Sequence, residues 1–361
     1  MDFSKIKRCF FLTDTHLGIR SNAQDWQNIM HDYFYNFFIP LVKKNYKPGD
    51  ILIHLGDVYD SRNSLNLKIL CMGIDIFEEL SKIFVDGIII IPGNHDCWAR
   101  SSNDVNSLKS LKWIPNINIL EEPASMQIGP KKFLFMPWRK DHAAEDECVT
   151  TMGPGNDYLI CHADIQGLKF NRQTIITDGC NTDNLKVFKT VYSGHIHYAQ
   201  KFKNVNMLGC PYQLTRGDMG NGKGITLLDL ETETETYWEN NYSPKFLKFK
   251  FADIIEMSPD KLNYIFRNNF IDIYIEGDMA LKAPINLFMD LLDGNYRRID
   301  FHPVLNEQTS ETDFQETNFD LLKFSKEYVD SLMYDDDTKK KLYDFIVKLY
   351  TRTEQQMYQQ T

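Results

Sequence analysis

Five short segments of this sequence combine acidic residues, histidines and one asparagine at close spacing. They are Asp14-Thr15-His16, Gly56-Asp57-Val58-Tyr59-Asp60, Gly93-Asn94-His95-Asp96, His162 and Gly194-His195-Ile196-His197. Their donors are carboxylates, imidazoles and a carboxamide without a thiolate, which suits manganese, iron or zinc better than calcium or copper(I), and manganese first of all. Two divalent cations held ~3.5–4 Å apart would activate a water and offset the charge on a phosphate. The segments therefore predict a two-metal phosphoesterase.

The alternative is that these residues are ordinary turns and helix caps. A single Asp-x-His or Gly-Asp pair occurs by chance often and is usually structural. Five of the nine histidines, however, lie in these segments. Each segment also follows a short apolar run, which scattered core histidines would not do. The complete set therefore favours one assembled site.

The apolar runs that precede the segments predict the strands of an α/β sandwich. They are residues 8–13, 51–55, 88–91, 132–136, 158–161 and 191–193, with helical patterns at 25–44 and 65–84. Alternating strands and helices are typical of an α/β architecture. Ligand sites in such sheets form at the carboxyl ends of the strands, where all five segments lie. Gly56, Gly93 and Gly194 suit the sharp turns that bring the loops together.

The overall composition predicts an ordinary globular protein. The chain has 361 residues, 43% of them hydrophobic, a formal net charge of −10 and seven cysteines. The cysteines form no Cys-x-x-Cys pair, so we expect reduced thiols and no disulfide framework. No apolar run is long enough to span a membrane and no cleavable signal is evident, so we expect a cytoplasmic protein. The negative charge disfavours a protein that coats nucleic acid, but bound cations would still attract a phosphate locally.

The sequence also predicts how the chain is divided. We expect a catalytic domain at residues 1–240 and, after a linker-like Asn-Asn-Tyr-Ser-Pro segment, a small α/β domain at 245–303. Residues 304–317 have linker composition. Residues 318–361 carry two amphipathic helices, a hairpin too small to bury both faces alone. The hairpin would pack either on another protein or on the chain's own core.

The ordered series of motifs resembles the calcineurin-like metallophosphoesterase superfamily over residues 8 to about 230. The resemblance implies a β-sandwich core flanked by helices and two metal sites. The first would be held by Asp14, His16, Asp57 and His197, and the second by Asp57, Asn94, His162 and His195. Asp57 would bridge the two ions. His95 would be the catalytic residue that is not a ligand, stabilising the phosphate and protonating the leaving oxygen, with Asp60 orienting it.

Residues around the motifs indicate the substrate. The segments 14–18 (DTHLG), 136–138 (MPW) and 208–218 (LGCPYQLTRGD) resemble the SbcD family of double-strand-break repair nucleases. Segments 162–167, 214–218 and 228–233 most resemble the recombination nuclease subunits of T-even-type bacteriophages. Cys161 departs from the pattern, since the family usually has glycine there. The Pro-Tyr-Gln-Leu-Thr stretch could otherwise be an ordinary loop.

This resemblance implies a 3′ exonuclease and single-strand endonuclease that acts on DNA as a homodimer. Residues 245–303 would be a DNA-facing capping domain, and residues 318–352 would grip the coiled coil of an SbcC-type ABC ATPase. The chain has no Walker A sequence, so ATP use would come from that partner. Basic residues near the motifs could meet DNA phosphates or be plain surface charges. They are Arg20, Arg62, Arg100 and Lys201, with Lys186, Lys189 and Lys203 beside the last motif.

Two rival functions stay open at this point. A phosphatase or phosphodiesterase of the same superfamily would act on small phosphoesters and would not need residues 304–361. A non-catalytic DNA-end scaffold would carry a structural metal site only. Such a site needs no additional acid, so the presence of His95 and Asp60 speaks against the scaffold.

Overall fold

The five motif segments follow strands of two six-stranded sheets. The computed structural model describes residues 2–98, 103–276 and 284–304, with isolated positions between 326 and 347. In the first sheet the order is β12-β11-β1-β2-β3-β4. Its strands are β1 (Arg8–Leu12), β2 (Asp50–His54), β3 (Ile88–Ile90), β4 (Ile117–Ile119), β11 (Gly224–Asp229) and β12 (Glu235–Glu239). β1 to β4 run parallel, whereas β11 and β12 pair antiparallel at one edge.

The second sheet has the order β5-β6-β7-β8-β10-β9. Its strands are β5 (Ala124–Ile128), β6 (Lys131–Met136), β7 (Tyr158–His162), β8 (Thr190–Gly194), β9 (Gln200–Phe202) and β10 (Val205–Met207). The four middle strands run parallel. The carboxyl ends of β7 and β8 therefore lie at one edge of this sheet, as those of β1 to β3 do in the first.

The two sheets pack face to face through an apolar core. Phe11 and Ile53 of the first sheet share this core with Phe135 and Ile160 of the second. Neighbouring residues such as Phe10 point to the opposite face and pack on helices. A strand buried on both faces needs apolar residues at every position, which explains why these strands read as continuous apolar runs.

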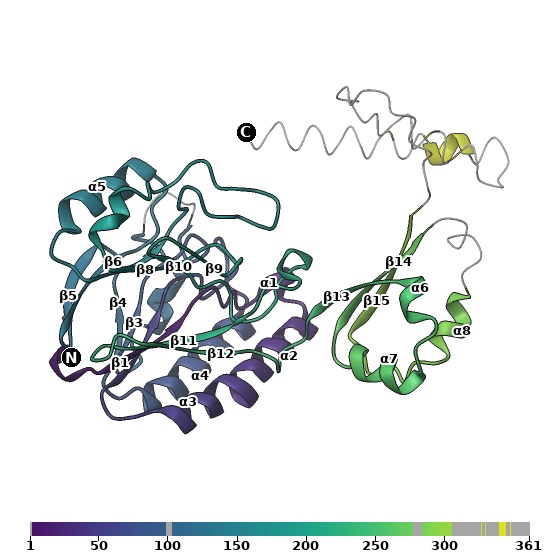
Figure 1. The fold of residues 1–361 in the computed structure, drawn as a ribbon, viewed down its shortest axis with the longest axis horizontal. Helices are drawn as coiled ribbons and strands as arrows, with labels where there is room; N and C mark the ends of the chain where they lie inside the picture. The colour runs from purple at the N-terminus through teal and green to yellow at the C-terminus, as the bar shows by residue number, and fades with distance from the viewer. Residues whose placement is uncertain are drawn as a thin grey trace. The chain divides into compact units, whose positions relative to one another are not determined.

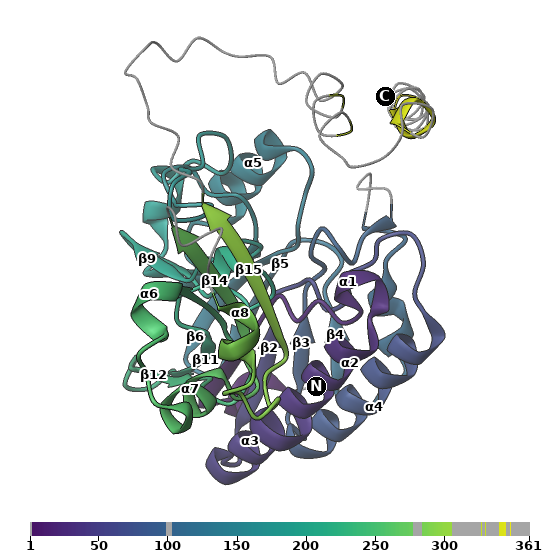
Figure 2. The same ribbon diagram turned by 90° about the vertical axis from the view of Figure 1, so that its right-hand side faces the viewer.

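Helices cover the outer face of each sheet. The first sheet is covered by α2 (Gln24–Asp32), a π-helical turn (Tyr33–Phe38), α3 (Ile39–Asn45) and α4 (Leu67–Ile83), and the second by α5 (His142–Met152). Figure 1 and Figure 2 show α2, α3 and α4 on one side of the sandwich and α5 on the other. The short α1 (Ile19–Asn22) follows the first motif. The expected β-sandwich core flanked by helices is confirmed.

Residues 246–276 and 284–304 contain a small parallel sheet of their own. It contains β13 (Phe246–Lys250), β14 (Phe270–Glu276) and β15 (Arg298–Val304), with α6 (Phe251–Ile254), α7 (Pro259–Phe266) and α8 (Ile285–Met289). Strands and helices alternate here, as expected for the small α/β domain predicted at residues 245–303. Arg216 donates to both carboxylate oxygens of Asp272 on β14, at 2.6 and 2.9 Å, and so ties the loop after β10 to this sheet.

The chain divides into two compact units, residues 1–305 and 306–361. The expected boundary near residue 240 therefore falls inside the first unit. Most of the predicted linker and helical hairpin lies outside the described residues. Within the described part of the chain, every helix is too short or too polar to cross a membrane.

Candidate metal centre

The fold brings all seven predicted ligands together where the carboxyl ends of the two sheets meet. Asp14 and His16 follow β1, Asp57 follows β2 and Asn94 follows β3. The remaining ligands, from the second sheet, are His162 at the end of β7 and His195 and His197 after β8. Two groups of these side chains, Asp14-His16-His197 and Asp57-His162-His195, have donor atoms that all lie within 4.8 Å of one another, and a third group combines His16 and Asp57 with His95.

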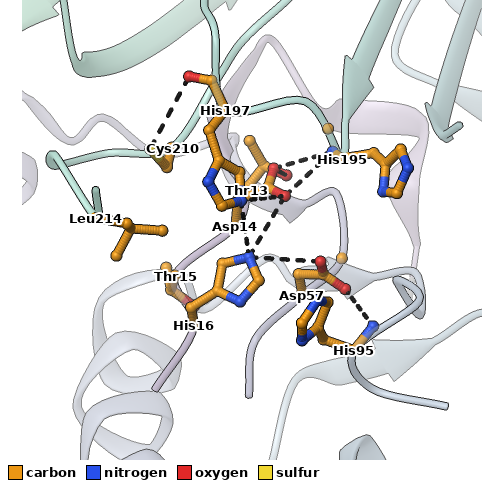
Figure 3. A network of polar contacts seen from close by, with 12 residues as sticks. Thr13, Asp14, Thr15, His16, Asp57, His95, His195, His197, Cys210 and Leu214 are labelled. Carbon is orange, nitrogen blue, oxygen red and sulfur yellow. Dashed lines mark hydrogen bonds and ion pairs between the residues drawn. The ribbon is translucent and has the colours of Figure 1, made fainter. Parts of the chain in front are cut away.

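The first group consists of Asp14, His16 and His197. Nε2 of His197 lies 3.0 Å from Nε2 of His16, and both nitrogens lie 3.9 Å from Oδ1 of Asp14. Figure 3 shows the His16 ring joined by dashed lines to Asp14, Asp57 and His197. The three side chains can therefore hold one cation between them.

The second group consists of Asp57, Asn94, His162 and His195. Oδ1 of Asn94 lies 3.1 Å from Nε2 of His162 and 2.9 Å from Nδ1 of His195. Oδ2 of Asp57 lies 3.4 Å from Nε2 of His162 and 3.5 Å from Nε2 of His16 in the first group. One oxygen of Asp57 thus faces both groups, which is the position a bridging ligand needs.

The donor set fits divalent cations chemically. Ligand bonds of ~2.1 Å to one ion bring adjacent donor atoms to about 3 Å from each other, as observed here. Burial alone would lower the pKa of His162, but the carboxylates of Asp57 and Asp14 raise it to about 9. The pKa of Asp57 is held well below its usual value by His162 and His16, although burial opposes this shift. The cluster therefore attracts positive charge.

Hydrogen bonds on the side of the ring away from the cluster orient two of the four predicted ligand histidines. Nδ1 of His162 contacts the Leu55 carbonyl at 2.7 Å, so it must carry the proton and leave Nε2 for the cluster. Nδ1 of His16 contacts Oδ1 of Asp60 at 3.0 Å. Such outer partners fix the tautomer and rotation of metal-binding histidines, and their loss usually weakens metal binding.

His95 stands at the edge of the cluster and is oriented differently from our expectation. Its Nδ1 contacts the backbone carbonyl of Asp60 at 2.6 Å, whereas the Asp60 carboxylate is 3.8 Å away and bonds His16. A carbonyl only accepts, so Nδ1 of His95 carries a proton and Nε2 is the nitrogen left to exchange a proton with a substrate. Burial lowers the pKa of His95 below its usual value.

The loops that carry the ligands hold strained backbone conformations. Asp14, His16, Asp57 and His195 all have positive φ, between 44° and 85°. Non-glycine residues rarely adopt this conformation, and they do so mainly where surrounding structure enforces it, as at functional sites. The close approach also explains Gly93, because a Cβ there would lie 2.2 Å from Oδ1 of Asp57.

Asp96 lies in the third motif, but the sequence predicts no role for this residue. Its buried carboxylate accepts from the backbone N–H groups of Asp57, Val58, Tyr59 and Gly93, at 2.8 to 3.3 Å. Burial and the nearby Asp57 charge raise the pKa of Asp96 to about 6. Its position two residues after Asn94 was the available signal, but nothing in the sequence shows that it fastens the second and third loops together.

A fourth donor group, His197, Cys210 and Asp218, already has a cation beside it. The ammonium of Lys223 lies 2.7 Å from Oδ1 of Asp218 and donates to the carbonyl of His197. Both charged side chains are almost fully buried, with side-chain exposures of 3% and 4%. Lys223 therefore neutralises Asp218 and braces the backbone of a predicted ligand.

A cleft of about 410 Å³ opens over the cluster. Its lining includes Asp57, Asn94, His95, His195 and His197, together with Phe170 and Tyr198. A space of this size accommodates a small ligand or one unit of a polymer. The arrangement can therefore present a phosphoester to both donor groups.

The basic residues expected at DNA are mostly engaged elsewhere. Arg20 donates to the Leu214 carbonyl, Lys201 pairs with Glu235, and Lys203 donates to Thr182. Lys186 and Lys189 pair with Asp183 and Glu233, and Arg100 lies outside the described residues. Arg62 donates to the Asn94 carbonyl at 3.0 Å, which brings its guanidinium next to the cluster.

Comparisons with known proteins agree with this geometry. The family model for calcineurin-like phosphoesterases matches residues 7–199. Exonuclease subunit 1 of Enterobacteria phage T4 is 26% identical over 231 residues, covering 64% of this chain and 67% of that protein.

Two solved structures are similar at a lower level. An archaeal phosphodiesterase aligns with a TM-score of 0.34 and 14% identity over 64% of this chain and 99% of its own. A protein of unknown function from Aquifex aeolicus aligns with a TM-score of 0.28 and 19% identity over 50% and 93%.

Proposed function

The chain belongs to the calcineurin-like phosphoesterase family of metal-dependent phosphoester hydrolases, and from this premise we propose that it is the DNA nuclease subunit of a recombination and double-strand-break repair complex. The observation that carries the proposal is Oδ2 of Asp57, which faces His16 in one donor group and His162 in the other. A shared carboxylate between two groups is the arrangement that a two-metal phosphodiesterase requires. We propose manganese as the metal, because the donors are nitrogen and oxygen without sulfur.

The chain's own residues have distinct roles in the proposed reaction. When bound, the two cations supply Lewis-acid activation of water and neutralise charge on the phosphate. One ion would be held by Asp14, His16 and His197. The other would be held by Asn94, His162 and His195. Asp57 would be a ligand of both ions. His95 would use Nε2 to donate a proton to the leaving oxygen. Its lowered pKa makes the imidazolium a stronger acid than it is in water, so it releases that proton readily.

DNA as the substrate is supported by the phage relative, an exonuclease subunit that is 26% identical over 231 residues. The segments 14–18 and 208–218 also resemble the SbcD family of repair nucleases. We propose exonuclease action from 3′ ends and endonuclease action on single strands. As partners we propose a second copy of the chain and an SbcC-type coiled-coil ATPase bound through residues 318–352.

One experiment separates this function from its rivals. The purified chain is incubated with Mn²⁺ and a linear duplex, with and without the coiled-coil ATPase from the same genome, and in parallel with a small phosphomonoester. DNA degradation that needs Mn²⁺ and increases with the ATPase is the expected result. Hydrolysis of the monoester with no action on DNA would favour a phosphatase. Binding of DNA ends without cleavage of either substrate would favour a scaffold.

A further inference from the structure

A loop between β7 and β8 ends over the metal cleft and is held in a defined shape. An antiparallel bridge pairs Lys169 with Ile175, so the loop doubles back on itself like a hairpin, and a parallel bridge joins Ile165 to Cys180 at its base. At its tip the N–H of Phe170 donates to the Thr174 carbonyl at 2.9 Å. The Asn171 side chain accepts from two backbone N–H groups of the same turn, both at 2.9 Å.

Two side chains fasten this hairpin to the rest of the domain. Gln200 accepts from the N–H of Lys169 at 2.9 Å and donates to its carbonyl at 2.6 Å, as a neighbouring strand would. The guanidinium of Arg172 donates to the Met219 carbonyl on the other side of the tip. Phe170 lies between these two attachments, so its backbone is positioned before any ligand arrives.

Phe170 exposes a large apolar ring at a polar site. Its side chain is 56% exposed, and it lines the same cleft as Asp57, His95 and His195. Burial in a core therefore does not account for the ring. An exposed aromatic ring beside a phosphate site is the arrangement that proteins use to stack bases of single-stranded nucleic acid. Lys169 is exposed next to it and suits the neighbouring backbone phosphate.

We propose that Phe170 stacks on an unpaired nucleobase of the strand whose phosphate occupies the metal cleft. The inference rests on the proposed nuclease function and deepens it, because it assigns a preference for unpaired nucleotides to one residue. A base inside a duplex already stacks on both faces and offers none to Phe170. Only a base at a frayed end or in a single strand can supply a free face, so stacking selects such substrates.

The hairpin supplies a matched control. Ile175 is also 56% exposed, but it is not part of the cleft lining. If the hairpin served only as an apolar surface for another protein, truncating either residue would have equal effects on that contact and none on cleavage. If Phe170 stacks on a base, truncating Phe170 should slow cleavage, whereas truncating Ile175 should not.

The test compares the full-length wild type, Phe170→Ala, Phe170→Trp and Ile175→Ala with Mn²⁺ on two single-stranded oligonucleotides. One oligonucleotide carries all its bases, and the other has a run of abasic residues at the cleavage position. We expect Phe170→Ala to lower kcat/KM on the complete strand by about 10- to 100-fold, mainly through KM, with Phe170→Trp and Ile175→Ala close to wild type. On the abasic run, the wild type should lose its advantage over Phe170→Ala.

Each outcome bears on the proposal. Equal rates for Phe170→Ala and wild type on the complete strand would overturn it. An equal loss on both strands would also overturn it, because a structural role for Phe170 does not depend on the base. Failure of the wild type to cleave either strand would overturn the nuclease function and this inference with it, whereas the first two outcomes leave the nuclease function standing.

Discussion

Nε2 of His195 lies 3.3 Å from Oδ2 of Asp164, while Nδ1 of the same ring faces Asn94 at 2.9 Å. Asp164 is therefore an outer partner of a proposed metal ligand, two residues after another ligand, His162. A carboxylate in this position fixes the ring's orientation and increases the basicity of the nitrogen that faces the metal.

Replacing Asp164 with Asn should weaken metal binding at the second site by about 10- to 100-fold, the range typical of lost outer partners. The amide keeps the size of the side chain but removes its charge. Calorimetric titration with Mn²⁺ measures the effect. Asp178→Asn, a nearby exposed carboxylate in the same loop, serves as the control and should bind like wild type. Equal affinities for the two variants would show that Asp164 does not support His195.

Replacing His95 with Ala should slow cleavage strongly but leave metal binding intact, because His95 is assigned no ligand role. General acids typically contribute about 10²- to 10⁴-fold to the rate, so kcat should fall by that factor. Steady-state kinetics and Mn²⁺ titration of the same preparation check both parts. His31→Ala, which removes an exposed histidine on α2, should change neither value. Unchanged turnover in His95→Ala would remove His95 from the proposed mechanism.

Replacing Lys223 with Met should lower the free energy of unfolding by about 3 kcal/mol, because a buried Asp218 loses its counter-charge. Additional replacement of Asp218 with Asn should recover part of this loss. Lys201→Met offers the comparison, since Lys201 forms an exposed pair with Glu235 and should cost less than about 1 kcal/mol. Urea denaturation measures all three variants. Similar decreases in the free energy of unfolding for Lys223→Met and Lys201→Met would mean that burial does not strengthen the ion pair of Lys223 with Asp218.

Much of the sandwich could be predicted from the sequence because its strands are buried on both faces. The apolar runs before Asp14, Asp57 and Asn94 matched β1, β2 and β3 to within a residue or two. Edge strands were missed for the opposite reason. β9 and β12 are short or mostly exposed and have a mixed composition, so no period distinguishes them from loops.

The candidate site was predictable at the level of residue types but not at the level of contacts. Histidine and aspartate after strand ends predicted which side chains would meet. The sequence could not show that Asp60 bonds His16 through its carboxylate and His95 through its carbonyl, because that depends on loop conformations with positive φ. The role of Lys223 could not be predicted from the sequence either. Its partner Asp218 is close in sequence, but burial of the pair follows from tertiary packing alone.

Glu145 on α5 provides a prediction about pH. Its carboxylate is fully buried, with Oε2 2.9 Å from Nδ1 of His142 and Oε1 without a hydrogen-bond partner among the described protein groups. Burial raises the pKa of Glu145 from 4.5 to about 7, although the contact with His142 opposes the shift. When the pKa of a carboxyl group is higher in the folded protein than in the unfolded chain, the group stabilises the folded state. This stabilisation is fully present below the pKa of the unfolded chain and is lost as the pH rises through the pKa of the folded protein. We therefore expect this contribution to stability to be lost between pH ~4.5 and pH ~7.

Replacing Glu145 with Gln should remove this loss, since the amide cannot ionise. Relative to wild type, the free energy of unfolding of Glu145→Gln should improve by about 2–3 kcal/mol between pH 5 and pH 8. Urea denaturation at both pH values, with a chelator present to exclude metal binding, gives this difference. Glu147→Gln changes an exposed carboxylate on the same helix and should follow the wild type at both pH values. The free energy of unfolding of Glu145→Gln could instead change with pH as that of the wild type does. Glu145 would then have the same pKa in the folded and unfolded chains, and its burial would carry no electrostatic cost.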